Sequence, residues 1–138
     1  MKIASVVARV LLGLMFTLSG AMGFFLIFGH MKMPAPPAGL ATDFNRVLFA
    51  SHYVLVVDAF QLLCGVLLLA NRYVPLALTI LAAILVNIVA FHVTMAPAGI
   101  VPGLVAWALW ALVARQHWGA FAPLFVAKRY ETGTRSTS

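Results

Sequence analysis

The sequence is poor in charged residues and in cysteine. Only 9% of its 138 residues are charged and only three are acidic, whereas a soluble domain has about 25% charged residues. So few charges cannot form a water-exposed surface, which excludes a soluble globular protein. The single cysteine, Cys64, excludes an intramolecular disulfide, a CxxC redox pair and a cysteine-rich zinc site. A thiol–disulfide exchange enzyme would need its second thiol from a partner protein.

Hydrophobic residues are in excess instead. They make up 64% of the chain, against about 45–50% in a typical soluble protein. Nine Lys and Arg residues against three Asp and Glu give a formal net charge of +6. These basic residues are scattered between apolar blocks, which indicates a membrane rather than a nucleic acid as the partner. We therefore expect the chain to be integral to a lipid bilayer and to bind no nucleic acid.

Four continuous apolar runs cover residues 5–28, 47–69, 74–95 and 98–114. A hydrocarbon core of about 30 Å needs about 20 helical residues, so the first three runs are long enough and the fourth is marginal. Spanning segments must be helices or strands of a closed barrel, and these runs lack the alternating polarity of barrel strands. The sequence predicts an all-α, four-transmembrane-helix bundle that forms a single domain over residues 1–130.

The links between the runs predict how the helices are arranged. Residues 70–73 and 96–99 form short connections, which favour antiparallel neighbours and an up-and-down topology. Beyond the fourth run, aromatic residues recur at helical spacing in residues 118–127, which predicts an interfacial segment. Residues 131–138 contain nothing to bury and are predicted to form a disordered tail. The stripe of the interfacial segment consists of Trp118, Phe121 and Phe125.

The distribution of Lys and Arg predicts the orientation in the membrane. Seven basic residues fall on one side of the four runs and two, Lys32 and Arg46, on the other. The positive-inside rule therefore places both termini in the cytoplasm of a multi-pass protein of the cell membrane. A cleaved signal peptide is the alternative for the first run, because Ser19-Gly20-Ala21 resembles a cleavage site. The seven residues are Lys2, Arg9, Arg72, Arg115, Lys128, Arg129 and Arg135.

Polar residues inside the apolar runs form a candidate pocket. A charged side chain at the centre of a bilayer costs about 2.5–3.5 kcal/mol on insertion scales, so such residues should face protein. Helical spacing places the polar residues of the second run on one stripe with Gly65, and Arg9 on a glycine-bearing stripe of the first run. We expect these faces to meet, with Arg9 reaching Gln61 before Asp58. The pocket consists of Arg9, Ser51, Asp58, Gln61 and Asn87.

Asp58, the only carboxylate in the membrane core, has two interpretations. It could carry a proton or bind a ligand, because intramembrane acids mark such paths. It could instead be a polar clasp that fixes how the first two helices pack. Asn87 is interpreted as an interhelical hydrogen-bonding residue. The pairs Gly13-x-x-x-Thr17 and Ser19-x-x-x-Gly23 allow close helix contact within one chain or in a homo-oligomer.

Histidine and methionine residues gather at the outer ends of the runs. His52 and His92 are candidate contacts for a quinone head group or another small ligand. Thioethers beside them would suit Cu(I), but no spacing here is a metal signature, so no metal site is assigned. Ordinary interface residues are the alternative. The candidate set for an outer-side metal is His30, Met31, Met33, His92 and Met95.

Three motifs in order resemble the DoxX family of small four-helix membrane proteins. The likeness covers residues 6–114. Gln61 stands where that family often has a glutamate, and Asp58 lies one turn earlier on the same face. The motifs are Arg9-x-x-x-Gly13-x-x-Phe16-x-x-Ser19-Gly20, then Gln61-x-x-x-Gly65-x-Leu67-Leu68-Leu69, then Pro75 followed by Val86-Asn87-Ile88 and Phe91-His92.

This resemblance implies a four-helix bundle associated with quinone-linked membrane oxidation or with complexes that handle thiol and oxidative stress. We expect an accessory or anchoring subunit of a quinone-linked redox system, with a redox partner subunit and quinone as the candidate cofactor. The chain has no nucleophile–base pair, dinucleotide fingerprint or metal motif, so no independent catalytic activity is expected. A small proton-coupled transporter that uses Asp58 is the alternative.

Overall fold

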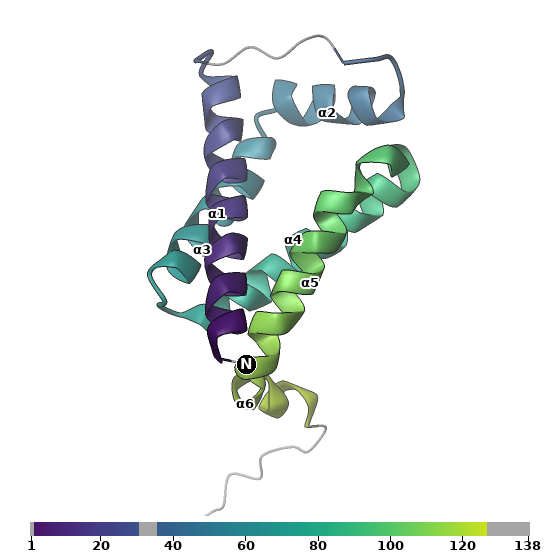
Figure 1. The fold of residues 1–138 in the computed structure, drawn as a ribbon. Helices are drawn as coiled ribbons and strands as arrows, with labels where there is room; N and C mark the ends of the chain where they lie inside the picture. Colours follow the sequence, from purple (N-terminus) through teal and green to yellow (C-terminus); the bar gives the residue numbers. More distant parts are fainter. Residues whose placement is uncertain (1, 31–35, 127–138) are drawn as a thin grey trace, which may run out of the picture.

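The computed structural model describes residues 2–30 and 36–126, and within them it contains helices and no strand. Figure 1 shows α1 packed along α3, with a hairpin of α4 and α5 beside them and α2 lying across one end. The start of α1 lies at the other end, next to α6. The helices are α1 (Lys2–Ile27), α2 (Leu40–Ala50), α3 (Val54–Leu69), α4 (Val74–Met95), η1 (Pro97–Gly99), α5 (Ile100–Gln116), α6 (Trp118–Phe121) and η2 (Ala122–Phe125).

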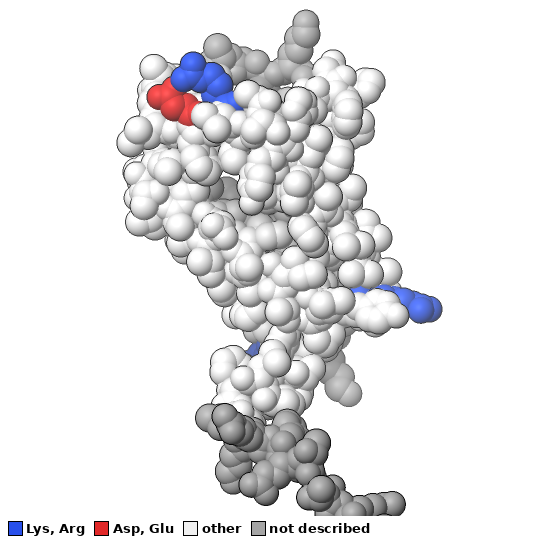
Figure 2. All heavy atoms as spheres, turned by 180° about the vertical axis from the view of Figure 1, so that it is seen from behind, with Lys and Arg blue, Asp and Glu red and all other residues white. Residues whose placement is uncertain are grey.

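Three helical segments are long and apolar enough to cross a membrane, namely Ile3–Ile27, Val74–Met95 and Pro97–Gln116. A fourth is added if α2 and α3 together form one broken span. Large apolar side chains are exposed along these helices, for example Ile3 at 81% and Val101 at 63%. Figure 2 shows a broad face on which acidic and basic side chains lie only toward the two ends. These surfaces suit contact with lipid.

The second apolar run is broken in two, and here the expected continuous span over 47–69 is wrong. α2 and α3 meet at an angle of 86°. The break falls at Ser51 to Tyr53, where His52 has a left-handed φ of 59° and the Ser51 hydroxyl accepts a bond from the Tyr53 amide at 3.3 Å. Ser side chains that bond nearby backbone compete with helix continuation. α3 alone has 16 residues, about 24 Å of helix.

Glycines set the contact between α1 and α3. A Cβ on Gly13 would lie 3.1 Å from the Gly65 carbonyl oxygen, and one on Gly20 would lie 2.5 Å from the Asp58 carbonyl oxygen. The separation at Gly20 leaves no room for a side chain, and the one at Gly13 is shorter than an ordinary van der Waals contact, so the two backbones approach closely. The prediction that the glycine stripe of the first helix meets the stripe of Asp58 and Gly65 is confirmed. Gly13 and Gly23 make these contacts within one chain.

The α4–α5 hairpin supplies much of the core. The 3-10 turn η1 joins the two helices, as the short link at 96–99 predicts. The Trp110 indole nitrogen donates to the Leu78 carbonyl oxygen at 2.8 Å, which ties α5 to α4. The largest fully buried side chains are Leu12, Cys64, Leu68, Leu78, Leu81, Leu85 and Val113.

The segment after α5 packs through aromatic rings. The rings of Trp118 and Phe125 stack, with their centroids 5.6 Å apart. The predicted tail, residues 131–138, lies outside the described residues.

The turn between α3 and α4 contains two residues in the left-handed region, Asn71 (φ 54°) and Tyr73 (φ 50°). This conformation is unfavourable for a bulky side chain but tolerated by asparagine. We expect Tyr73→Gly to raise the free energy of unfolding by about 0.5–1 kcal/mol, because Tyr73 is 70% exposed and loses little packing. Asn71→Gly is the matched control and should change it less. Thermal unfolding in detergent measures both, and equal gains would contradict the argument.

Candidate cavities at the α2 end of the bundle

Two cavities open where the α4–α5 hairpin diverges from α1 and α3. The first has a volume of about 530 Å³ and lies among α2, α3 and α4. The second, of about 400 Å³, lies among α1, α3, α4 and α5. Gln61, Ile88 and His92 line both, so these three side chains form the partition between the cavities. A joint volume of this size suits a small-molecule ligand.

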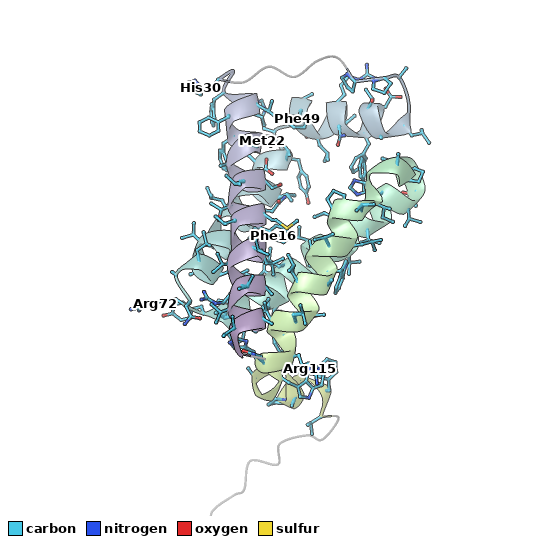
Figure 3. All side chains as sticks on the ribbon, in the orientation of Figure 1. Phe16, Met22, His30, Phe49, Arg72 and Arg115 are labelled. Atoms are coloured by element: carbon cyan, nitrogen blue, oxygen red, sulfur yellow. The ribbon has the colours of Figure 1, made fainter. Side chains whose placement is uncertain are left out.

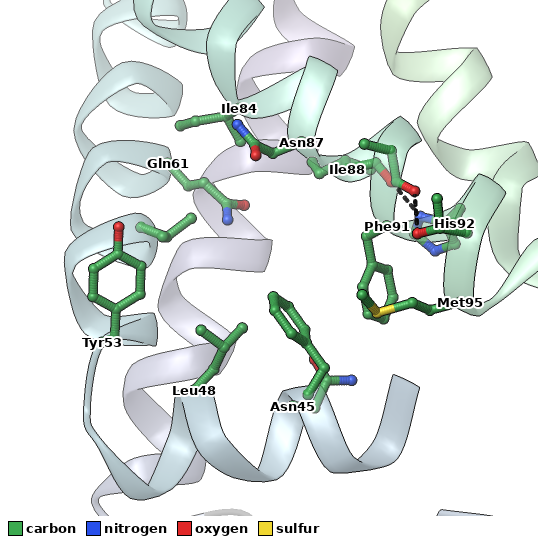
Figure 4. A pocket seen from close by; sticks show the side chains of 14 residues that line it. Asn45, Leu48, Tyr53, Gln61, Ile84, Asn87, Ile88, Phe91, His92 and Met95 are labelled. Carbon is green, nitrogen blue, oxygen red and sulfur yellow. Dashed lines mark hydrogen bonds between the residues drawn. The ribbon is translucent and has the colours of Figure 1, made fainter. Parts of the chain in front are cut away.

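The wall of the first cavity is largely apolar, with a few polar groups. Figure 4 shows the Gln61 amide projecting from α3 toward the space bordered by Asn87 and Phe91 of α4. The Phe44 ring of α2 lies 5.7 Å from the Phe91 ring, so α2 closes this side through aromatic contact. Tyr53, at the start of α3, also lines the cavity. Apolar walls with few polar groups are typical of sites for amphipathic ligands.

Hydrogen-bonding capacity remains free in the partition. Gln61 is 7% exposed, and its Oε1 has no hydrogen-bond partner among the described residues. His92 Nδ1 lies 2.7 Å from the Ile88 carbonyl oxygen. A carbonyl only accepts, so Nδ1 carries the proton and Nε2 of the neutral ring is an acceptor. Beside the partition, in the first cavity, Asn87 Nδ2 donates to the Ala83 carbonyl oxygen at 2.9 Å, which leaves its second N–H for a ligand.

His92 has a close neighbour in the second cavity. A Cβ on Gly99 would lie 3.0 Å from His92 Nε2 and 2.9 Å from Cδ2. The glycine therefore leaves room for the imidazole to stand at the partition. Met95 lines the first cavity with His92, so two of the residues in the candidate metal set come together.

The other members of the candidate metal set do not support a metal site. Met31 and Met33 lie outside the described residues. His30 stands at the end of α1 (Figure 3), with its ring 6.2 Å from that of Phe25. In residues 2–30 and 36–126, no group of three or more His, Cys, Asp or Glu side chains is placed to hold a metal ion.

Asp58 lies outside both cavities. It is 5% exposed and sits against α1, where a Cβ on Gly23 would overlap its carboxylate. Its Oδ2 has no hydrogen-bond partner in the part of the chain that the structure describes. The contact with α1 is thus one of packing rather than a hydrogen-bonded clasp. Thr17 Oγ1, which is likewise buried without a partner, adjoins Gly65 in the same interface.

Arg9 does not reach Gln61. Its guanidinium donates to the Leu68 carbonyl oxygen near the end of α3. The antiparallel register explains this: Gly13 faces Gly65, and Arg9 lies one turn nearer the start of α1, so it lies opposite the end of α3. The long arginine side chain thus places its charged group at the end of α3, where it bonds a backbone carbonyl oxygen. Arg9 is therefore separate from the cavities, and its expected contact with Gln61 is wrong.

Ser51 and His52 are also separate from the pocket, because they line neither cavity; both are exposed at the break between α2 and α3. Ser51 falls on the stripe of Asp58 only if the helix is continuous, and the break removes it from that stripe. Of the five residues in the predicted pocket, the first cavity brings together Gln61 and Asn87. Phe44 and Tyr53 were not predicted as cavity residues, and the only signal for them in the sequence was the aromatic content around α2 and the break that follows it.

Fold and cavities together define a class: a helical protein with three to four membrane-length apolar segments and a divided cavity at one end. No family model, curated protein or solved structure matches the chain.

Proposed function

We propose that this chain is a DoxX-like accessory or anchoring subunit of a quinone-linked membrane redox system, and that the first cavity holds the quinone head group. The observation that carries the proposal is the buried Gln61 amide, whose Oε1 is unpartnered at the partition between two largely apolar cavities. Amide N–H groups of Gln61 and Asn87 can donate to quinone carbonyl oxygens. Gln61 Oε1 and His92 Nε2 can accept from the hydroxyls of the reduced form.

The proposed arrangement in the membrane has four spans, with α2 and α3 as one broken span and both termini in the cytoplasm. Two observations support it: the excess of Lys and Arg at the N-terminal end of the bundle, and the position of α6 at that same end (Figure 1). The cavities then lie toward the outer leaflet, beneath α2. A quinone supplies electron and proton transfer when bound, while these residues bind and orient it, and a partner subunit supplies catalysis.

Quinone retention tests this function. Protein purified in mild detergent should carry quinone that mass analysis detects, and Gln61→Leu should lower the amount per protein about fivefold, as expected for one lost hydrogen bond. Thr79→Val is the matched control, because Thr79 is an exposed α4 residue whose hydroxyl bonds the Pro75 carbonyl oxygen and which lines neither cavity. Wild-type protein without quinone, or equal retention by both variants, would count against the proposal.

A second candidate is a small proton-coupled transporter. It is favoured by one observation: the buried Asp58 carboxylate has an oxygen without a partner, and unpaired intramembrane acids mark proton paths. An imposed pH gradient should then drive solute uptake into vesicles that contain the protein, and Asp58→Asn should abolish this uptake. If neither wild type nor variant shows uptake that depends on the gradient, the transporter is excluded.

A further inference from the structure

A third cavity lies at the opposite end of the bundle from the first two. It has a volume of about 370 Å³ and is formed where α5 ends and the α6–η2 segment turns back against it. Trp110, Trp118, Phe121 and Phe125 give it aromatic walls, and Arg115 stands at its edge. We call this feature the aromatic groove. Figure 3 shows Arg115 beside α6, at the same end as Arg72.

No described residue compensates the charge at the groove. Arg115 is exposed, and the structure gives its side chain no ion pair within residues 2–30 and 36–126. The only ion pair found there joins Asp43 and Arg46, in α2 at the far end of the molecule. An arginine guanidinium matches the geometry of a phosphate and binds it in bidentate fashion.

The neighbouring surface is suited to acyl chains. Leu124 and Phe125 are 71% and 73% exposed and continue the apolar wall of the groove outward. The groove also lies at the end of Pro97–Gln116, a segment of membrane length, so an occupant can enter it from the bilayer. Aromatic residues at a membrane interface sit at the level of the lipid head groups.

We infer that the aromatic groove binds an anionic phospholipid, with the phosphate on Arg115 and an acyl chain between Trp118 and Phe125 on one side and Trp110 on the other. Phospholipids carry a phosphate and acyl chains in one molecule, which accounts for the pairing of an arginine with aromatic walls, and the net negative charge of the anionic ones favours them at the Arg115 cation. The site is independent of the quinone proposal, because it shares no lining residue with the other two cavities.

Bromine on acyl chains quenches tryptophan fluorescence at close range, so it reports occupancy of the groove. The full chain is reconstituted in phosphatidylcholine vesicles, and brominated phosphatidylglycerol or brominated phosphatidylcholine is titrated in. We expect quenching to indicate about a fivefold preference for phosphatidylglycerol, the value for one basic residue near an anionic lipid. Arg115→Gln should abolish the preference, and Arg115→Lys should retain part of it.

Arg72→Gln is the matched control, because Arg72 is an exposed arginine at the same end that does not line the groove. It should keep the preference of the wild-type protein. Trp118→Phe should remove part of the quenchable signal, since Trp118 lines the groove. The inference is overturned if the two lipids quench wild-type protein equally, or if Arg72→Gln and Arg115→Gln reduce the preference by the same factor.

Discussion

Replacing Gly65 with alanine is expected to lower the free energy of unfolding by about 1–3 kcal/mol, the usual range for overpacking. A Cβ at this position would lie 2.5 Å from the Thr17 amide nitrogen and 2.8 Å from the Gly13 carbonyl oxygen. Both atoms belong to the backbone of α1 and cannot rotate away. The helices must separate, and that movement strains the most extensive helix contact in the bundle. Thermal unfolding in detergent would measure the loss.

The control for Gly65→Ala is Gly119→Ala, because a Cβ on Gly119 meets nothing within 4 Å. This change should leave the midpoint of unfolding nearly unaltered. Thr17→Ala should not rescue Gly65→Ala, since it removes the hydroxyl and leaves the amide nitrogen in place. If Gly65→Ala unfolds like the wild type, α1 and α3 do not approach as the structure has them.

The apolar runs and glycine spacing predicted much of this fold. Membrane length and apolarity identified α1 and α4 almost residue for residue, because both properties follow from composition along one segment. The contact of Gly20 and Gly23 with Asp58 followed from helical periodicity. The break at Ser51 to Tyr53 was not predictable from hydropathy, because the apolar run continues through it. Local hydrogen bonding and tertiary packing determine the left-handed conformation of His52, and neither can be read from the run.

The cavities were harder to predict than the helices. Gln61, Asn87 and His92 were identified because they are polar in an apolar setting. Their grouping depends on how far α4 and α5 diverge from α1 and α3, which no single segment encodes. The same limit explains Arg9, whose partner is set by the register of α1 against α3 rather than by its own helix.

The largest coupling between two positions is expected for Gly23 and Asp58. The three atoms nearest to a Cβ on Gly23 all belong to the Asp58 side chain. Gly23→Ala alone should therefore lower the free energy of unfolding by about 1–3 kcal/mol. Asp58→Ala removes those atoms together with a buried, unpartnered carboxylate, whose burial is itself unfavourable. That variant should be as stable as the wild type or more stable.

The double variant decides between packing and a hydrogen-bonded clasp. With the carboxylate gone, the alanine methyl at position 23 fills the space it vacated, so Gly23→Ala should cost little in the Asp58→Ala background. The coupling free energy from the four-protein cycle should reach about 1–3 kcal/mol. If Asp58 were a clasp, Asp58→Ala would be destabilising by itself and the double variant would be no better. Gly20→Ala in the same background is the control, because its nearest contacts are the backbone oxygen of Asp58 and the backbone nitrogen of Leu62, which remain when the carboxylate is removed.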